Sequence, residues 1–429
     1  MRMRPVVNVA LPALCAIGLA TAMLAAQVPF EQAVSDLSSP STGKRLRAAQ
    51  LLKEAAYPEA AVPLAKAILD PENEVQLEAI GAEVNIFLAE KVVVRKRVGF
   101  LIEVRNPISA EAAFSQGPLA LGPRPVPQEV LTALRAASRD ETARVDLEAL
   151  YAFGALAVEP GGAARRELLR VAGPDLAAMI GVPDAHMRYA ALRVIGRLFE
   201  WRLNDAPIEQ TVGDAVITAL NDKDRPFRAA AMQALGSMRY NRSVQALTDL
   251  FQYFGKGELA EGALDAIARI GHPSSAGLLT SQLASRDLTM KLSAIEGLAR
   301  VGDSSNAAAV DAALKSERND ALLLAGTFAA AALSKGSITP IIEALAKPRL
   351  RDLARAYLAE LASWRSADFA RYLTDPDWQM RVDLVDALGL GHNPAALPLA
   401  EPLLKDQDPQ VARAAERTVA RLRNDPKTP

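Results

Sequence analysis

Cysteine is nearly absent from this chain, which has only one, Cys15, in 429 residues. Cys15 lies inside the apolar N-terminal segment, so a chain that loses this segment contains no thiol. This scarcity excludes a disulfide framework, a thiolate nucleophile and a zinc site with cysteine ligands.

Histidine is also scarce, with three residues, His186, His272 and His392. No two of them lie three or four positions apart, so no helical metal-binding pair exists. His272 and His392 each follow a glycine and precede a proline within two positions, at equivalent turn positions where Asp303 stands in another turn. We interpret these two as turn or capping residues and place His186 at a helix start. Neither a metal nor any other cofactor is predicted.

Aromatic residues make up only 5% of the chain, although 50% of it is hydrophobic. Its core must therefore be filled by small aliphatic residues, which suit closely packed helices better than a β-sandwich. The chain is also long for one compact domain. Its 49 basic residues nearly balance its 50 acidic ones, so nothing indicates a nucleic-acid partner.

The N-terminus has the pattern of a secretory signal peptide. Arg2 and Arg4 precede an apolar stretch over 6–20, and small residues follow up to Ala26, where we predict cleavage. The alternative is an uncleaved helix over 6–26 that anchors the protein in a membrane. In either case the remaining chain is predicted to be periplasmic or secreted. No later segment is apolar enough to span a membrane.

The strongest signal is an internal repeat. With Arg228 as position zero, apolar residues fall at positions −1, +3, +4, +6, +7 and +10, which form one broad face of a helix. From Ala260 onward the copies step by about 31 residues, a period typical of a solenoid. Position zero of the other copies falls at Asp146, Arg188, Ala260, Lys291 and Arg381, with weaker copies at Arg45, Gln76, Arg351 and Ala412 and one near Leu322.

A second, shorter amphipathic stretch separates the copies, for example over 244–251, 307–314, 338–345 and 397–404. Each unit is therefore predicted to be a helix, a turn and a helix. Glycines follow the template helix, where we predict a left-handed C-cap; they are Gly271, Gly302 and Gly391. Asp-Pro pairs precede it, and we expect their aspartates to cap it; they begin at Asp70, Asp375 and Asp408.

Segments 187–196 and 227–236 resemble the short HEAT repeats of the phycobilisome-lyase-like type, and the resemblance is best over 184–422. It implies an all-α fold, an armadillo-like HEAT solenoid in which paired helices stack into an α-α superhelix. One relative, deoxyhypusine hydroxylase, holds iron with His-Glu pairs. Here the three histidines are followed by Met187, Pro273 and Asn393, so that motif is absent. No residue set marks the activity of the bilin lyases either.

The pattern divides the chain into a signal peptide (1–26), N-terminal HEAT-like repeats (27–90), an irregular insertion (91–127), a main repeat array (128–424) and a polar tail (425–429). Within the insertion, 92–105 is compatible with a long helix or a strand pair, and 117–127 is a proline-rich loop. We interpret the insertion as a spacer, with a functional insertion as the alternative. The two arrays are expected to stack into one curved body, because each repeat needs a neighbour to bury its apolar face.

Positions +5 and +9 of the template helix point away from the predicted core. Position +5 holds Arg193, Gln233, Asp265, Glu296 and Asp386, and position +9 holds Arg197, Arg269, Arg300 and Arg421. One interpretation is structural, because acid-first pairs four residues apart stabilise their own helix by about 0.2–0.5 kcal/mol. The other is functional: an arginine ladder on the concave face for an extended acidic partner, formed by Arg193, Arg197, Arg269 and Arg300.

These observations predict an exported HEAT-repeat scaffold for protein–protein interaction, without evident catalysis. The predicted partner is an unidentified protein, and neither a nucleic acid nor a small-molecule substrate is indicated. Two alternatives remain open. One is an enzyme or enzyme accessory of the lyase-like or metal-dependent HEAT type, and the other is a membrane-tethered structural protein of the cell envelope.

Overall fold

The computed structural model describes residues 29–88, 124–158, 161–204 and 206–423, and these residues form α-helices and short 3₁₀ helices without a β-strand. The first four helices are α1 (Phe30–Asp36), α2 (Thr42–Ala55), α3 (Ala61–Ala67) and α4 (Asn73–Phe87). The next group comprises α7 (Gln128–Ala137), α8 (Ala143–Leu156), α9 (Gly162–Met179), α10 (Ala185–Leu198), α11 (Gln210–Ala219), α12 (Arg225–Met238), α13 (Val244–Phe254) and α14 (Glu258–Ile270). The last group comprises α15 (Ala276–Gln282), α16 (Leu288–Val301), α17 (Ala307–Leu314), α18 (Asp320–Ser334), α19 (Thr339–Ala344), α20 (Arg351–Arg365), α21 (Trp378–Leu390), α22 (Leu397–Ala400) and α23 (Pro409–Arg423).

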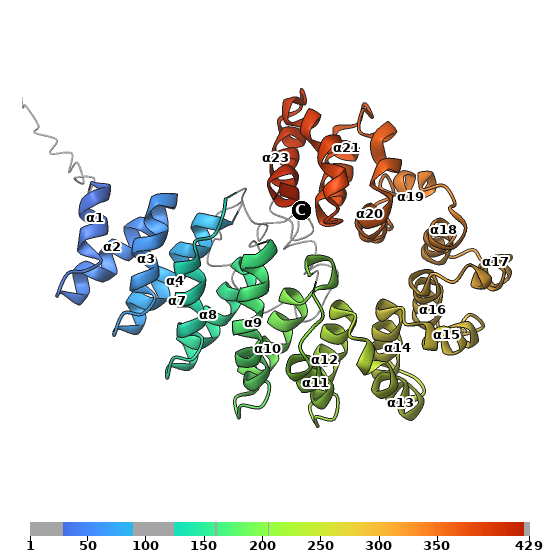
Figure 1. Ribbon diagram of the computed structural model, residues 1–429, viewed down its shortest axis with the longest axis horizontal. Helices are drawn as coiled ribbons and strands as arrows, with labels where there is room; N and C mark the ends of the chain where they lie inside the picture. Colours follow the sequence, from blue (N-terminus) through green and yellow to red (C-terminus); the bar gives the residue numbers. More distant parts are fainter. Residues whose placement is uncertain (1–28, 89–123, 159–160, 205, 424–429) are drawn as a thin grey trace, which may run out of the picture.

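The helices pair into repeats that stack along a curved path (Figure 1). Each predicted copy of the template coincides with one helix, and the copy near Leu322 is α18. From α10 to α18 these template helices line the inner side of the curve, while α11, α13, α15 and α17 lie outside. The predicted all-α solenoid is thereby confirmed. No helix within the described ranges is long and apolar enough to cross a membrane.

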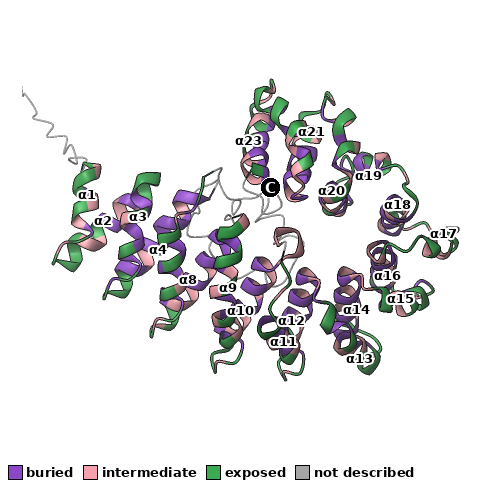
Figure 2. Ribbon diagram, viewed as in Figure 1, coloured by how far each residue is buried: buried purple, intermediate pink, exposed green. Residues whose placement is uncertain are grey.

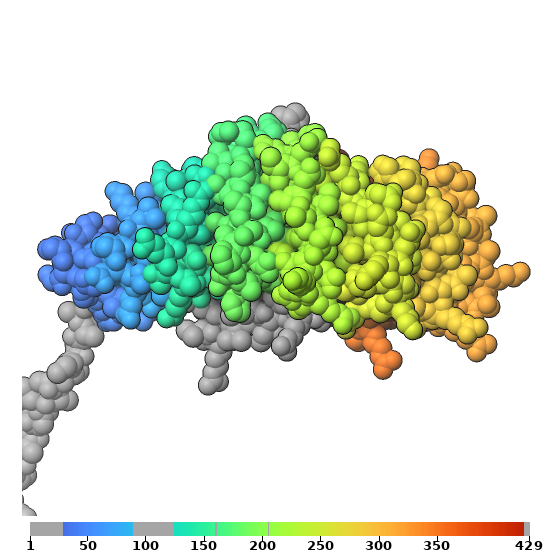
Figure 3. All heavy atoms as spheres, turned by 90° about the horizontal axis from the view of Figure 1, so that it is seen from below, coloured from blue at the N-terminus to red at the C-terminus, as the bar shows by residue number. Residues whose placement is uncertain are grey.

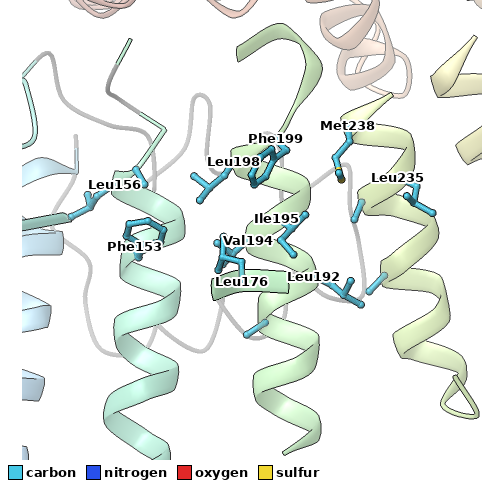
Figure 4. Close-up of a cluster of buried hydrophobic side chains, with 14 of the residues drawn as sticks. Phe153, Leu156, Leu176, Leu192, Val194, Ile195, Leu198, Phe199, Leu235 and Met238 are labelled. Carbon is cyan, nitrogen blue, oxygen red and sulfur yellow. The ribbon is translucent and has the colours of Figure 1, made fainter. Parts of the chain in front are cut away.

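The core lies between the helices of successive repeats, as the purple faces in Figure 2 show. Position +7 is at most 1% exposed in six copies, at Phe153, Ile195, Leu235, Ile267, Leu298 and Leu388. Around α10, side chains such as Phe153, Val194 and Leu198 fill the space between neighbouring helices (Figure 4). Each repeat therefore supplies half of two interfaces and has no closed core of its own.

A row of small residues at position +8 lets the inner helices approach closely. It consists of Gly154, Gly196, Gly236, Ala268, Ala299, Ala359 and Gly389. A Cβ atom on Gly196 would lie 3.1 Å from Cα of Ala234, and one on Gly236 would lie 3.1 Å from Cα of Ala266. Larger side chains at this position would force the inner helices apart. The close inner spacing bends the stack towards the template helices.

The N-terminal and main arrays form one continuous body, as predicted. Helix α4 packs on α8 and α3 packs on α7, so the repeats on either side of the insertion are direct neighbours. The space-filling view shows successive repeats in contact along the body without a break (Figure 3). The predicted signal peptide and residues 92–105 of the insertion lie outside the described residues.

The predicted C-caps are correct at two turns and wrong at one. Gly271 and Gly302 end their helices in the left-handed conformation, with φ of 64° and 74°. Gly391 instead has φ of −69°, and the left-handed residue is the next one, His392. A Cβ on Gly391 would lie 2.7 Å from Cβ of Ala362, so this glycine is required for close packing rather than for its φ angle.

The predicted aspartate caps need a similar correction. Asp408 accepts a hydrogen bond from the backbone N–H of Gln410 (2.7 Å), as a capping aspartate should. Asp70 and Asp375 lie two residues before the N-cap residue of their helix. Each carboxylate accepts a hydrogen bond from the backbone N–H of that N-cap residue (2.9 Å in both). They close the turn before the helix and do not cap the helix itself.

Arg165, near the start of α9, is almost completely buried, at 2% exposed. Its guanidinium donates to the carbonyl of Ala157 (3.1 Å) and to that of Leu198, at the C-terminal ends of α8 and α10. Carbonyls at helix ends lack partners within the helix and carry partial negative charge. Arg165 therefore satisfies two helix ends at once, which accounts for an arginine inside the enlarged repeat.

Glu83 is a charged residue in a core position. It stands at position +7 of the α4 copy, where other repeats have a hydrophobic residue, and it is 0% exposed. Neither carboxyl oxygen has a hydrogen-bond partner among the described residues. Burial raises the pKa of Glu83 well above its ordinary value, because the site does not solvate a negative charge.

We predict that Glu83→Leu stabilises the protein at neutral pH by about 1–3 kcal/mol, because it removes an unsatisfied buried group. A raised pKa in the folded state means that wild-type stability is fully present below pH ~4.5 and decreases above it by up to about 1.4 kcal/mol per pH unit. The advantage of Glu83→Leu in urea unfolding should therefore be larger at pH 8 than at pH 4.5. Glu74→Leu, at an exposed site on the same helix, is the control and should show no such pH dependence.

Candidate functional site on the concave face

Four of the basic residues at position zero each join their repeat to the next. Arg45, Arg188, Lys291 and Arg381 pair with acids in the turn before the following template helix. The N–O distances are 2.6 Å to Asp70, 2.7 Å to Asp222, 2.8 Å to Glu317 and 2.7 Å to Asp406. Each of these acids also accepts a hydrogen bond of 2.8–2.9 Å from the backbone N–H of the residue two positions later. These ion pairs hold adjacent turns together, and the charges of both partners are already neutralised within the protein.

The first half of the predicted arginine ladder lies on α10. The Arg193 guanidinium donates to the side-chain oxygen of Gln233 (3.1 Å), which stands at the same position in the next repeat. Arg197 donates from Nε to the carbonyl of Gly154 (2.9 Å) in the preceding repeat. The side-chain amide of Gln233 is neutral, so this hydrogen bond does not cancel the charge of Arg193.

The second half of the ladder is paired with carboxylates. Arg269 binds Asp265 (2.8 Å), and its side chain is 38% exposed. Arg300 binds Glu296 on its own helix (3.1 Å) and, from Nε, both carboxyl oxygens of Glu360 on α20 (3.1 and 3.2 Å). The Arg300 side chain is only 10% exposed. The ladder thus lies on the inner side, but its members are not equally available to a partner.

A group of charged and aromatic residues gathers where the inner helices converge. We call Arg239, Glu296, Arg300, Tyr357 and Glu360 the inner charge cluster. Arg239, at the end of α12, binds Glu360, which lies 121 residues further along the chain. Tyr357 donates its hydroxyl to Glu296 (2.5 Å) and stacks on Phe328, with ring centroids 4.5 Å apart.

Two residues that follow α10 extend this cluster. The guanidinium of Arg239 lies 3.6 Å from the ring centroid of Trp201, within cation–π range. Arg202 pairs with Glu200 (2.8 Å). The side chain of Arg239 is thus held between an aromatic ring and a carboxylate.

The charges in the cluster determine its protonation. Burial opposes ionisation of Glu360, but the Arg300 and Arg239 guanidinium groups outweigh it and lower the pKa of this carboxyl. Burial also raises the pKa of Tyr357 well above its ordinary value, and the Glu296 carboxylate adds to this effect. Glu360 is therefore ionised and Tyr357 neutral near neutral pH.

The last repeat contributes two more arginines. Arg417 on α23 forms an ion pair with Asp386 on α21 (3.3 Å). Burial raises the pKa of the Asp386 carboxyl group above its ordinary value. Arg421 lies one turn further on α23, and its pKa is lowered by burial and by the nearby cations Arg417 and Arg202. Positive charge from the turn after α10 thus acts on the last repeat.

Sequence reasoning missed Glu360 and Arg239. Glu360 stands at position +9 of its copy, in the same row as Arg269 and Arg300, and this register was available from the sequence. Arg239 stands at position +11, where other copies have Gly271 and Gly302. No pattern along the chain indicates that these two side chains meet, because they belong to repeats that are not neighbours.

The histidines take the turn positions expected of them, with one shift. His272 caps the 3₁₀ turn before α15: its Nδ1 accepts from the backbone N–H of Ser274 (3.3 Å), and Asp303 does the same for Ser305 (2.9 Å). In the turn after α21 the capping residue is Asn393 and not His392. The side-chain oxygen of Asn393 accepts a hydrogen bond from the backbone N–H of Ala395 (3.0 Å). His186 is exposed in the first turn of α10. The described residues contain no group of three or more potential metal ligands.

The fold and the repeat register define a class, the α-solenoids. Residues 173–253 match the family model of HEAT repeats, the repeat type that the sequence predicts for this part of the chain. No match to a curated protein was found.

Several solved structures have a similar arrangement of helices. An engineered protein has 18% sequence identity and a TM-score of 0.44, and the match covers 92% of this chain and 98% of the other. The complex of CpcE and CpcF of phycocyanin lyase from Nostoc has 16% identity and a TM-score of 0.39, over 58% and 94% of the two chains. Importin beta has 15% identity and a TM-score of 0.35, over 90% and 49%.

We predict that Asp406→Asn destabilises the protein by about 1–2 kcal/mol, because it replaces a charge-assisted pair with Arg381 by a neutral one. Hydrogen bonding from Arg381 lowers the pKa of Asp406, so this stabilisation is present above pH ~4 and is lost as the pH falls further. Asp375→Asn is a matched control, because Asp375 closes the equivalent turn before α21 and no ion pair of its carboxylate is found within the described part of the chain. Equal urea midpoints for the two variants at pH 7 would show that the inter-repeat pair contributes nothing.

Proposed function

We propose that this protein is an exported scaffold that binds an acidic, extended segment of a protein partner on its concave face. The support is the continuous inner surface of template helices, which offers a long track of side chains. Solenoids of stacked repeats use such concave surfaces for extended partners. The fold by itself does not determine the partner, so the chemistry of the partner is inferred from the charged residues at positions +5 and +9 of the inner helices.

The observation that carries the proposal is the pairing of Arg193. Its guanidinium is bonded to the neutral amide of Gln233, so it retains positive charge and further N–H donors. Arg197 and Arg269 lie in the same two rows of the inner helices. A planar guanidinium suits carboxylate recognition because it forms two parallel hydrogen bonds.

Arg300 has a different role within this proposal. It already faces the carboxylates of Glu296 and Glu360, so little of its charge is available to a third acid. We assign it to the support of the inner surface. Arg193 is then the arginine that contacts the partner directly.

Arg193→Glu should weaken capture of the partner by about tenfold or more, because it places a like charge opposite an acidic segment. The test uses the exported protein as bait in a cell-envelope extract and quantifies the retained protein in 0.1 M and 0.5 M salt. Arg170→Glu is the control, since Arg170 lies on α9 with a side chain that is 62% exposed and pairs only with Glu167 among the described residues. Retention that is equal for both variants, or that does not respond to salt, would rule out the arginine row as the binding surface.

Export is a separate part of the proposal and has its own test. The support is the basic start with Arg2 and Arg4, the apolar stretch over 6–20 and the small residues before Gln27. We expect the protein in the periplasmic or secreted fraction with an N-terminus near Gln27, as determined by N-terminal sequencing. A membrane-bound chain that still begins at Met1 would favour the tethered alternative, and a soluble cytoplasmic chain would contradict export.

A further inference from the structure

The inner charge cluster joins helices whose repeats are not neighbours along the chain. The ion pairs at position zero span 25–34 residues, as expected for neighbours in a solenoid. Arg300 and Glu360 are 60 residues apart, and Arg239 and Glu360 are 121 apart. The contacts of Glu360 therefore pass over intervening repeats and connect α12, α16 and α20 across the concave side.

Arg239 makes this contact at some cost to the backbone. It ends α12 in the left-handed conformation, with φ of 49°, at a position where Gly271 and Gly302 end their helices without a Cβ. A non-glycine residue in this conformation is strained, because its Cβ atom lies too close to the following carbonyl oxygen. The contacts of the Arg239 side chain offset this strain.

The neighbours of Arg239 direct its side chain inward. The ring of Trp201 lies 3.6 Å from the guanidinium, and Glu360, whose side chain is only 13% exposed, receives it at the other end. Arg300 contacts the same carboxylate with a side chain that is 10% exposed. Charges this poorly solvated interact more strongly than surface pairs, and separating them requires their hydration shells to be restored.

We propose that Arg239, Arg300 and Glu360 form a clasp that sets the curvature of the solenoid between α12 and α20. Stacked repeats contact only their neighbours, so many small changes of angle add up and the stack is easily bent. The clasp opposes this, because its contacts exist only at one curvature and vanish when the concave side opens. This inference concerns the shape of the protein and does not depend on the proposed partner.

The test is a distance measurement across the clasp. Spin labels are attached to cysteines introduced at the exposed positions Asn241 and Ala367, next to α12 and α20, with Cys15 replaced by serine. Pulsed electron–electron resonance then gives the distribution of distances between the labels. Glu360→Gln keeps the side-chain shape and removes the charge, and we expect it to shift the distribution to longer and broader distances. Arg239→Gly should do the same while its helix end loses strain.

Lys335→Gly is the matched control. Lys335 also ends its helix in the left-handed conformation, with φ of 54°, but its side chain is exposed and outside the cluster. It should relieve the same strain and leave the distances unchanged. Circular dichroism of each variant checks that the helices persist. Distances in Glu360→Gln and Arg239→Gly that match those of the wild type, with the helices intact, would overturn the clasp.

Discussion

The structure depends on the close packing of its inner helices. Every repeat buries its apolar face against two neighbours, and the small residues at position +8 determine how near those neighbours come. Because the inner helices are the closely spaced layer, the stack must curve, and the curvature creates the concave side where charged residues from distant repeats meet. A single constraint on side-chain size thus leads from the local helix pair to the overall shape (Figure 1).

The charged residues fall into two groups with different consequences. The pairs at position zero connect adjacent turns and recur along the chain, so they hold the stack together wherever they occur. The inner charge cluster occurs where several repeats converge, and its members come from α12, α16 and α20. The first group contributes to stability in each repeat, whereas the second depends on the shape of the whole array. Arg193 belongs to neither group, which is why the proposed binding surface rests on it.

The histidine and glycine positions show how far local patterns reach. His272 and Asp303 occupy the same place in two turns and make the same hydrogen bond, as their sequence context predicts. His392 has nearly the same context, yet here the left-handed residue is His392 itself, one position after the glycine, and Asn393 takes over the cap. The same local signature thus gives two different turn geometries.

The sequence by itself determined the repeat, its register and the buried positions, because a helix face with a period of 3.6 residues and its bounding turns are local properties. It also placed Arg193, Arg197, Arg269 and Arg300 in two rows. The acid-first pairs Asp265–Arg269 and Glu296–Arg300 are readable from the sequence, but only the tertiary structure brings Glu360 to Arg300 and Arg239, which lie 60 and 121 residues away from it. The angle between successive repeats accumulates over the array, and only the accumulated curvature brings Glu360 to these arginines.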